Sequence, residues 1–172
     1  MNLSTRNIKG KLKIKIKKCI KLLGKEYTSL NYVIYFYDGK EKLQKEQFDK
    51  PNMEVEQYDQ IINGQTEIAG VTLGEKGIIK IFLFVFEDVE KRPEEVIHLV
   101  GNLYHEIRHA WQYENKLFKK EEEVLKIDGD TEAYFQLDSE KDAYKFQKEL
   151  MKKHGNRILE TFGFANLNIE FN

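Results

Sequence analysis

The chain is poor in several features that would by themselves define a class of protein. Its one cysteine, Cys19, excludes an intrachain disulfide and a cysteine-based zinc site, and its apolar neighbours predict a buried, inert thiol. The longest apolar run, IFLFVF at 81–86, is far shorter than the roughly 20 residues of a membrane span, and no signal-peptide core is evident. The formal charge of −1 gives the molecule as a whole no basic field to attract nucleic acid. We therefore expect a soluble, cytoplasmic protein with neither a membrane nor a nucleic-acid partner.

The sequence does contain enough apolar material for one core. Hydrophobic residues make up 41% of the 172 residues and aromatic residues 12%, which is typical of folded globular proteins. No internal repeat and no low-complexity linker divides the chain. We therefore expect a single domain over residues 1–172. The oligomeric state does not follow from these features.

The period of the apolar residues predicts a small sheet followed by helices. In chain order the expected elements are an N-terminal helix within 4–24, a strand at 31–40, loops with or without a short helix at 40–66, a β-hairpin at 67–88, a helix at 93–115, a turn at 128–130 and a last helix from 138 to about 155. The expected fold class is α+β, with a small, mostly antiparallel sheet packed against the later helices.

The N-terminal segment admits two interpretations. Leu12, Ile14 and Ile16 alternate as in a strand, but a longer apolar set from Ile8 to Leu23 fits one helical face and ends at Gly24. We therefore favour a helix whose lysines are solvated. A nucleic-acid or anionic-lipid patch is the alternative, although no aromatic residues are interleaved with the lysines.

The expected hairpin turns around Gly74–Gly77, and its second strand, at 77–87, is apolar on both faces. Such a strand is deeply buried or covered by a helix. If it is also an edge, an extended peptide could pair with it through main-chain hydrogen bonds.

The stretch HEIRH, from His105 to His109, is the most informative motif. Residues four apart lie above one another on a helix, so both imidazoles can reach one zinc ion. Glu106 is offset from that ion but lies where it can act on a water molecule beside it. The alternative is that these are ordinary surface histidines. Because the motif falls within a strongly periodic helix, whose apolar stripe runs from Val96 to Ala110, we favour the metal site.

A catalytic zinc site needs a third protein ligand. Gln112 and Asn115 stand where the compact form of this motif has a glycine and a third histidine, so that subclass is excluded. Asp130 and Glu132, near a turn, are possible ligands, whereas His154 at a helix end has the alternative role of capping carbonyls. The acids at 121–123 resemble a solvated charge run.

Glu140, in LDSEKDAYKFQKEL, is the strongest candidate for the third ligand. It shares a helical stripe with Ala143, whose small side chain would let this helix approach the histidine helix closely. The alternative is that Ser139 and Asp142 form a capping box and that Glu140 merely complements the helix dipole.

HEIRHAWQ followed by EKDAYKF resembles the minimal gluzincin metallopeptidases, especially the ImmA/IrrE-like group and, more distantly, the integral-membrane CAAX-protease relatives. In that group the second helix carries Glu-x-x-Ala, which Glu140 and Ala143 match, while Tyr144 stands where Asp or Asn is usual. The resemblance covers about residues 67–154, the expected core of the metal site. It implies Zn²⁺ held by His105, His109 and Glu140. No helix-turn-helix partner domain is evident, so a gene-regulatory role is not expected.

The expected function is therefore a zinc-dependent peptidase that acts on a peptide or protein substrate, with Glu106 as general base. The main alternative is a non-catalytic zinc-binding or protein-interaction domain. An oxyanion-stabilising group is also expected, and the candidates are Tyr104, Arg108, Tyr113, Tyr134, Tyr144 and His154. Arg108 has a second possible role, which is to pair with Asp142 and brace the two helices.

Overall fold

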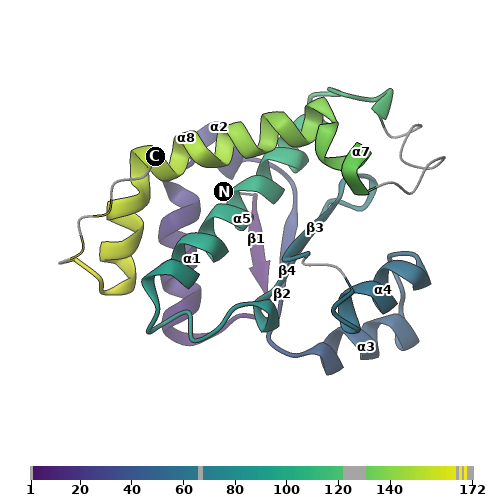
Figure 1. Ribbon diagram of the computed structural model, residues 1–172, viewed down its shortest axis with the longest axis horizontal. Helices are drawn as coiled ribbons and strands as arrows, with labels where there is room; N and C mark the ends of the chain where they lie inside the picture. The colour runs from purple at the N-terminus through teal and green to yellow at the C-terminus, as the bar shows by residue number, and fades with distance from the viewer. Residues whose placement is uncertain (1, 66–67, 122–130, 166, 168, 170–172) are drawn as a thin grey trace.

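The computed structural model describes residues 2–65, 68–121, 131–165, 167 and 169, and the elements below lie within them. The strands are β1 (Ser4–Arg6), β2 (Val33–Tyr37), β3 (Gly70–Leu73) and β4 (Ile78–Phe82). The α-helices are α1 (Gly10–Lys21), α2 (Lys25–Thr28), α3 (Lys40–Asp49), α4 (Val55–Ile62), α5 (Pro93–Glu114), α7 (Thr131–Gln136) and α8 (Asp138–Phe162) (Figure 1). Two 3-10 turns, η1 (Gly74–Lys76) and η2 (Leu83–Val85), flank β4. The fold class is α+β, as expected.

The sheet is mixed, so the expectation of a mostly antiparallel sheet is wrong. Its strand order is β1-β2-β4-β3, and β2 is parallel to both of its neighbours while β3 is antiparallel to β4. Parallel pairing of β1 with β2 needs a crossover connection, which α1 and α2 supply. The expectation rested on the hairpin alone, and the three-residue strand β1 is too short to produce an alternating pattern.

β4 is an interior strand, so the idea of a peptide-binding edge at 77–87 is also wrong. It pairs with β2 on one side, at Ile34↔Ile79, and with β3 on the other, at Gly70↔Ile81. Interior position and helices on both faces explain why this strand is apolar on both sides. The exposed edge at this end of the sheet belongs to β3.

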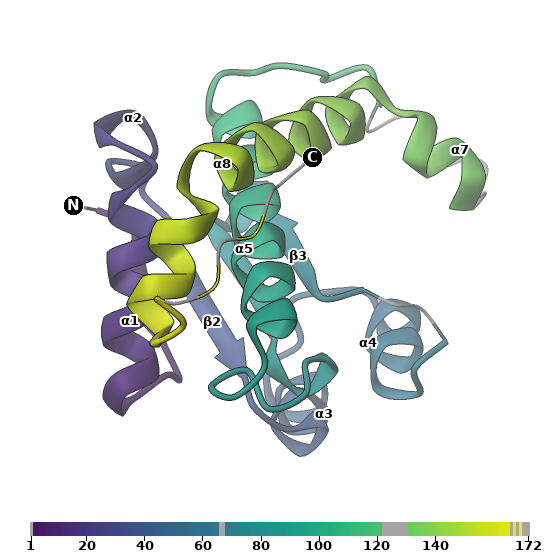
Figure 2. The same cartoon turned by 60° about the vertical axis from the view of Figure 1, so that its left-hand side comes forward.

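Helices cover both faces of the sheet. One face supplies alternate residues to the larger core, beneath α1, α5 and α8: Ile34, Phe36, Ile79 and Ile81. The other face supplies Tyr37 and Phe82 to a smaller core with Leu43 of α3 and Tyr58 of α4. Figure 2 shows α3 and α4 apart from the group formed by α1, α5 and α8.

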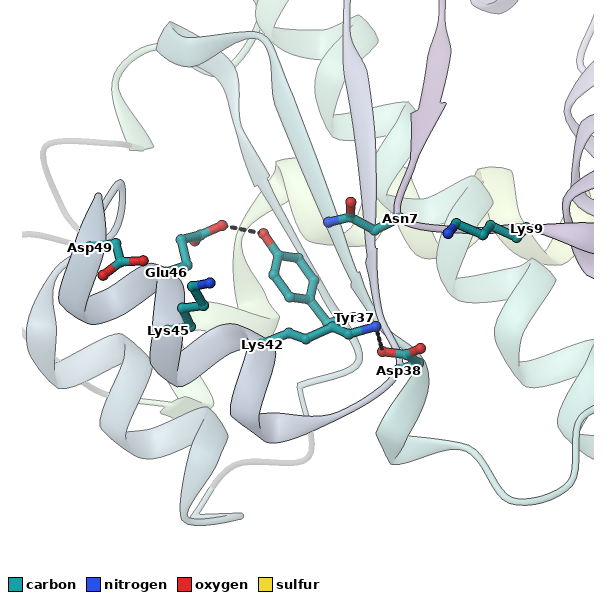
Figure 3. Close-up of a pocket in the computed structure, with 8 residues that line it drawn as sticks. All are labelled: Asn7, Lys9, Tyr37, Asp38, Lys42, Lys45, Glu46 and Asp49. Atoms are coloured by element: carbon teal, nitrogen blue, oxygen red, sulfur yellow. Dashed lines mark hydrogen bonds and ion pairs between the residues drawn. The ribbon is translucent and has the colours of Figure 1, made fainter.

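A buried ion cluster fastens α3 and α4 to the sheet. Lys80 of β4 is 0% exposed, and its ammonium donates to Glu46 of α3 and, at 3.3 Å, to the hydroxyl of Tyr58. Glu46 also accepts hydrogen bonds from Tyr37 and, at 2.6 Å, from Tyr58. Figure 3 shows Glu46 and Tyr37 bonded at the wall of a cavity of about 610 Å³. Because these charges are paired with each other, we assign the cluster a structural role.

The N-terminal helix is confirmed as α1, and Cys19 lies on its buried side with the pKa of the thiol raised to about 12 by burial. The segment 40–66 holds more structure than expected, because α3 and α4 occupy most of it. α3 buries one residue, Leu43, and α4 buries two, Tyr58 and Ile61. So few apolar positions give a weak helical period in the sequence.

The two longest helices, α5 and α8, begin where the sequence predicts. α5 covers the expected 93–115, and α8 begins at Asp138. α8 ends later than expected, at Phe162, because Ile158, Leu159 and Phe162 continue its buried stripe and offset the cost of Gly155 within the helix. None of the helices in the described part of the chain is long and apolar enough to cross a membrane. The turn expected at 128–130 lies outside the described residues.

Candidate metal centre

α5 carries the HEIRH motif, and it is buried on its polar side as well as on its apolar side. The expected apolar stripe is in the core: Val96, Val100, Leu103, Ile107 and Ala110 are all 0% exposed. His105 and Glu106 lie outside this stripe but are only 5% and 6% exposed, because α8 and β3 pack against that side of the helix. A solvated polar face is therefore excluded for these two residues.

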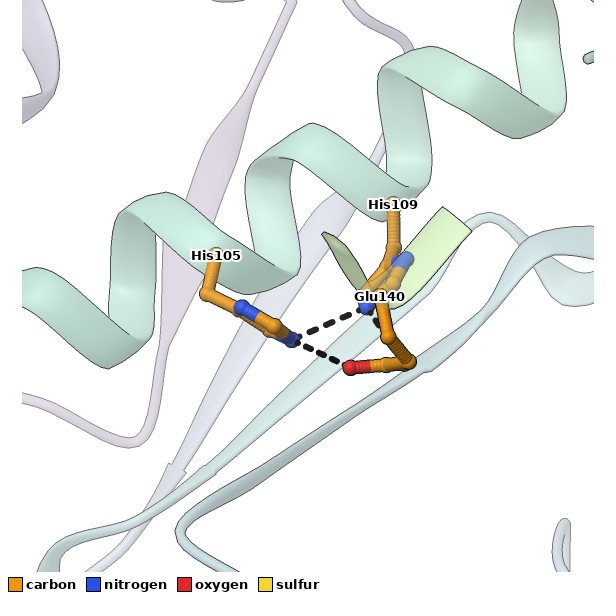
Figure 4. Close-up of side chains that lie close together, drawn as sticks. All are labelled: His105, His109 and Glu140. Atoms are coloured by element: carbon orange, nitrogen blue, oxygen red, sulfur yellow. Dashed lines mark hydrogen bonds and ion pairs between the residues drawn. The ribbon is translucent and has the colours of Figure 1, made fainter. Parts of the chain in front are cut away.

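His105, His109 and Glu140 point toward a common centre (Figure 4). The two Nε2 atoms lie 3.0 Å apart, and Glu140 places Oε2 at 3.2 Å from His105 Nε2 and Oε1 at 3.0 Å from His109 Nε2. Two zinc ligands with bonds of about 2.0–2.1 Å at a tetrahedral angle lie about 3.3 Å apart. The distances between the ligand atoms of the three residues are thus close to those expected around one small divalent cation.

The charges at this centre also favour a cation. Glu106 and Glu140 are buried carboxylates, and burying negative charge without compensation is costly. Burial acts to lower the pKa of His109, but Glu140 and Glu106 outweigh it and raise that pKa to about 9. Burial acts to raise the pKa of Glu140, but hydrogen bonds from the two histidines and Tyr134 hold it well below its ordinary value. The two carboxylates thus draw positive charge to this centre, which favours a bound cation.

Glu140 reaches the centre because of how α8 begins. It lies in the first turn of α8 and is 2% exposed, and Ala143, one turn later, is 0% exposed where the two helices meet. The amides of Asp138 and Ser139 donate to the carboxylate of Glu121, at 2.9 and 3.2 Å. Glu121 therefore binds the N-terminus of α8, and the alternative of a capping box within 139–142 is excluded because the helix begins before Ser139. Residues 122 and 123 of the expected charge run lie outside the described residues.

Gln112 fixes the orientation of His109. Its amide nitrogen donates to the carbonyl of Ser139 at 2.9 Å and to Oδ2 of Asp142 at 2.7 Å. Both amide protons are thereby used, so Oε1 is the atom that faces Nδ1 of His109 at 2.9 Å and must accept from it. This bond places the proton on Nδ1 and leaves the lone pair on Nε2, the form in which histidine binds a metal.

The expected pair between Arg108 and Asp142 is confirmed. The guanidinium donates through Nε to Oδ2 at 2.7 Å and through Nη2 to Oδ1 at 3.1 Å, which is bidentate geometry. Because Asp142 also accepts from Gln112, one carboxylate on α8 holds two residues of α5. The helices that carry the three candidate ligands are thus joined beside the centre.

Glu106 lies between α5 and the edge strand. The hydroxyl of Thr72 in β3 lies 2.7 Å from Oε2 of Glu106 and 2.8 Å from its main-chain carbonyl. A Cβ atom at Gly70 would lie 2.7 Å from Cγ of Glu106 and 2.7 Å from Oδ1 of Asn102, so only glycine allows β3 to approach this closely. Glu106 is therefore held against β3, and it is not one of the three residues whose ligand atoms converge.

Among the six candidates for oxyanion stabilisation, Tyr134 and Tyr144 lie at the centre. Tyr134 hydrogen-bonds Glu140, and the ring of Tyr144 packs against that of His105 at a tilt of 56°, with centroids 4.5 Å apart. Tyr104 instead donates to the carbonyl of Cys19 at 2.8 Å.

Arg108 and Tyr113 have contacts with other residues, and His154 lies far along α8. Arg108 is engaged with Asp142 and Tyr27. Tyr113 packs against Gly74 of η1. His154 lies about 21 Å along α8 from Glu140 at 1.5 Å per residue. Of the alternative ligands, Asp130 and the side chain of Glu132 lie outside what the structure describes.

Sequence reasoning missed Gln112, Glu121 and Thr72. In the sequence, Gln112 stands out as a departure from the compact motif. Its position three residues after His109, on the same face of the helix, is the signal that could have found its contact with that histidine. Thr72 and Glu121 carry no such signal, because Thr72 contacts Glu106, and Glu121 the start of α8, from segments distant in sequence.

Comparison with known proteins finds no family model, no curated protein and no solved structure that matches this chain. The resemblance to the minimal gluzincin group therefore stays a hypothesis that rests on the motifs themselves.

Proposed function

We propose that the protein is a zinc-dependent peptidase. The observation that carries this proposal is the convergence of His105, His109 and Glu140 within 3.0–3.2 Å of one another, with the buried carboxylate of Glu106 beside them. Three protein ligands and a nearby base are the composition of catalytic rather than closed structural zinc sites. A purely structural site has no use for Glu106.

The residues of the chain divide the chemistry between them. Bound zinc supplies Lewis acidity, which polarises a carbonyl group and lowers the pKa of a water molecule. Glu106 would accept a proton from water on its carboxylate and pass it to the leaving amine. Thr72 holds Oε2 of Glu106, which directs the remaining oxygen for proton transfer. Tyr134 and Tyr144 are the hydroxyls available to stabilise developing negative charge.

The edge strand β3 supports a peptide as substrate. β3 lies beside Glu106 through Thr72, and its outer side has no partner strand among the described residues. An extended peptide can add to such an edge through main-chain hydrogen bonds, which favours unfolded substrates and modest side-chain selectivity. Strand addition is therefore proposed at β3, since β4 is an interior strand.

The test compares the protein with Glu106→Gln, measuring both zinc content and cleavage of a peptide library. Glu114→Gln, an exposed position at the end of α5, is the matched control. We expect equal zinc in all three proteins and a loss of about 10²–10⁴-fold in cleavage for Glu106→Gln alone. Equal zinc with no cleavage by any of them would favour the non-catalytic zinc-binding domain.

A further inference from the structure

The fold gathers positive charge that is scattered in the sequence. Residues 9–21 contain seven lysines, and residues 145–157 contain four lysines, Arg157 and a single acid, Glu149. These two segments carry a formal charge of +11, and the remaining chain carries −12. The first segment is Lys9 together with α1 and the second is the central part of α8, and these two helices pack side by side in Figures 1 and 2. The net charge of −1 therefore conceals a strongly polarised molecule.

A cavity of about 800 Å³ lies where these two helices meet. Lys18 and Lys21 line it from α1, and His154 and Arg157 line it from α8, with Glu160 as the one acid among its described lining residues. Among the described residues, the side chains of Lys18, Lys21 and Arg157 have no hydrogen bond or ion pair, in contrast to Lys15, which binds Glu90 at 3.3 Å. The cavity therefore has cationic donors that nothing in the described protein uses.

The lowered pKa of His154 is consistent with a cationic cavity. Burial, Lys153 and Arg157 all lower the pKa of its imidazole. A neutral histidine in a cationic cavity still offers a hydrogen-bond donor, and its pKa reports the local potential.

We propose that this cavity between α1 and α8 binds a phosphate-bearing ligand. The three cations and Glu160 sum to a charge of +2, which matches a phosphate group, whose charge at neutral pH is about −1.5 to −2. A volume of this size suits a small molecule or a lipid headgroup. The site is independent of the metal centre and of the proposed peptidase activity.

Other occupants fit the cavity less well. α1 has little apolar surface to offer a bilayer, because Ile16, Cys19 and Ile20 are 0% exposed in the core and only Ile14 among its large apolar residues is exposed. No Phe, Tyr or Trp lines the cavity among the described residues, so bases of a nucleic-acid strand have no stacking platform. The C-terminal dipole of α1 accounts for lysines in its last turn, but Arg157 lies more than a turn before the end of α8.

The test is calorimetric titration with inorganic pyrophosphate at low ionic strength. The double variant Lys18→Gln/Arg157→Gln removes two charges from the cavity, and Lys11→Gln/Lys148→Gln removes two exposed charges from the same helices outside it. We expect the first to weaken binding at least about tenfold and the second less than about threefold, because charges in contact with the anion attract it more strongly than charges further away. Equal weakening in both, or no binding by the unaltered protein, overturns the proposal.

A second readout does not depend on how the variants fold. Saturating pyrophosphate should raise the pKa of His154, followed by NMR in the unaltered protein, because the bound anion offsets Lys153 and Arg157. An unchanged pKa of His154 under saturating pyrophosphate places the binding elsewhere and overturns the assignment.

Two further arms identify the source of the phosphate. Sedimentation with phosphatidylcholine vesicles that contain phosphatidic acid, competed by pyrophosphate, would indicate a headgroup, and binding of pyrophosphate alone would indicate a soluble ligand. A single-stranded oligonucleotide that the cavity variant binds undiminished, and that pyrophosphate does not displace, would assign the charge to an extended strand and overturn the cavity as the site.

Discussion

Replacing Gln112 with leucine should weaken zinc binding by about 10–100-fold. The change removes the acceptor at 2.9 Å that holds the proton of His109 on Nδ1, and the donors at 2.9 and 2.7 Å that tie α5 to Ser139 and Asp142. A 10–100-fold loss corresponds to about 1.4–2.7 kcal/mol. That is the size expected when a buried imidazole loses its fixed orientation and its N–H is left without a partner, which costs about 1–3 kcal/mol.

The assay is a competition for zinc with a chromophoric chelator, combined with thermal unfolding to check the fold. Gln147→Leu is the matched control, because Gln147 also lies between α5 and α8, next to Gly101, but among the described residues makes no hydrogen bond to a candidate ligand. Gln112→Glu separates the two roles of the amide: it keeps the acceptor for His109 but loses the donor to Asp142. If Gln112→Leu folds and holds zinc as tightly as Gln147→Leu does, the positioning role of Gln112 is wrong.

Further outcomes follow from the other contacts. Thr72→Val should lower the rate of cleavage with zinc affinity unchanged, and Thr72→Ser should retain the rate, because only the hydroxyl at 2.7 Å positions Glu106; a rate equal in both variants argues against this role. Gly70→Ala should destabilise the fold by about 1–3 kcal/mol in urea unfolding, since its Cβ would lie 2.7 Å from Cγ of Glu106. Glu46→Gln should cost about 3–5 kcal/mol at neutral pH, because Lys80 is left buried and unpaired. Burial acts to raise the pKa of Glu46, but hydrogen bonds from Lys80 and two tyrosines lower it below its ordinary value of 4.5. The stabilisation is therefore present above pH 4.5 and is lost as the pH falls through the pKa of Glu46 in the folded protein. A urea midpoint that is equally sensitive to acid in Glu46→Gln would refute this.

Elements with a long, regular apolar period were predictable from the sequence. α5 and the start of α8 follow from stripes of buried residues at three- and four-residue steps, and these two helices bring the candidate ligands together. The pairing of Arg108 with Asp142 was also within reach, because Arg108 lies one position from His109 and Asp142 lies two positions from Glu140. The helical period of the apolar residues was therefore enough to predict the two helices that hold the candidate ligands.

What depends on contacts distant in sequence was not predictable. The parallel pairing of β1 with β2 is created by a crossover, and a three-residue strand shows no period of its own. The capping of α8 by Glu121 and the contact of Thr72 with Glu106 join segments 17 and 34 residues apart. Burial of Lys80 could not be read from an otherwise apolar strand, since its partner Glu46 lies on a helix that the sequence pattern did not show.

The central claim is that His105, His109 and Glu140 bind one divalent cation. Crystals grown with zinc and measured on both sides of the zinc absorption edge test it most directly. We expect a single anomalous peak about 2.0–2.2 Å from Nε2 of both histidines and from a carboxylate oxygen of Glu140. No peak at this position in crystals that hold zinc elsewhere, or a peak with Glu140 turned away from it, would contradict the account.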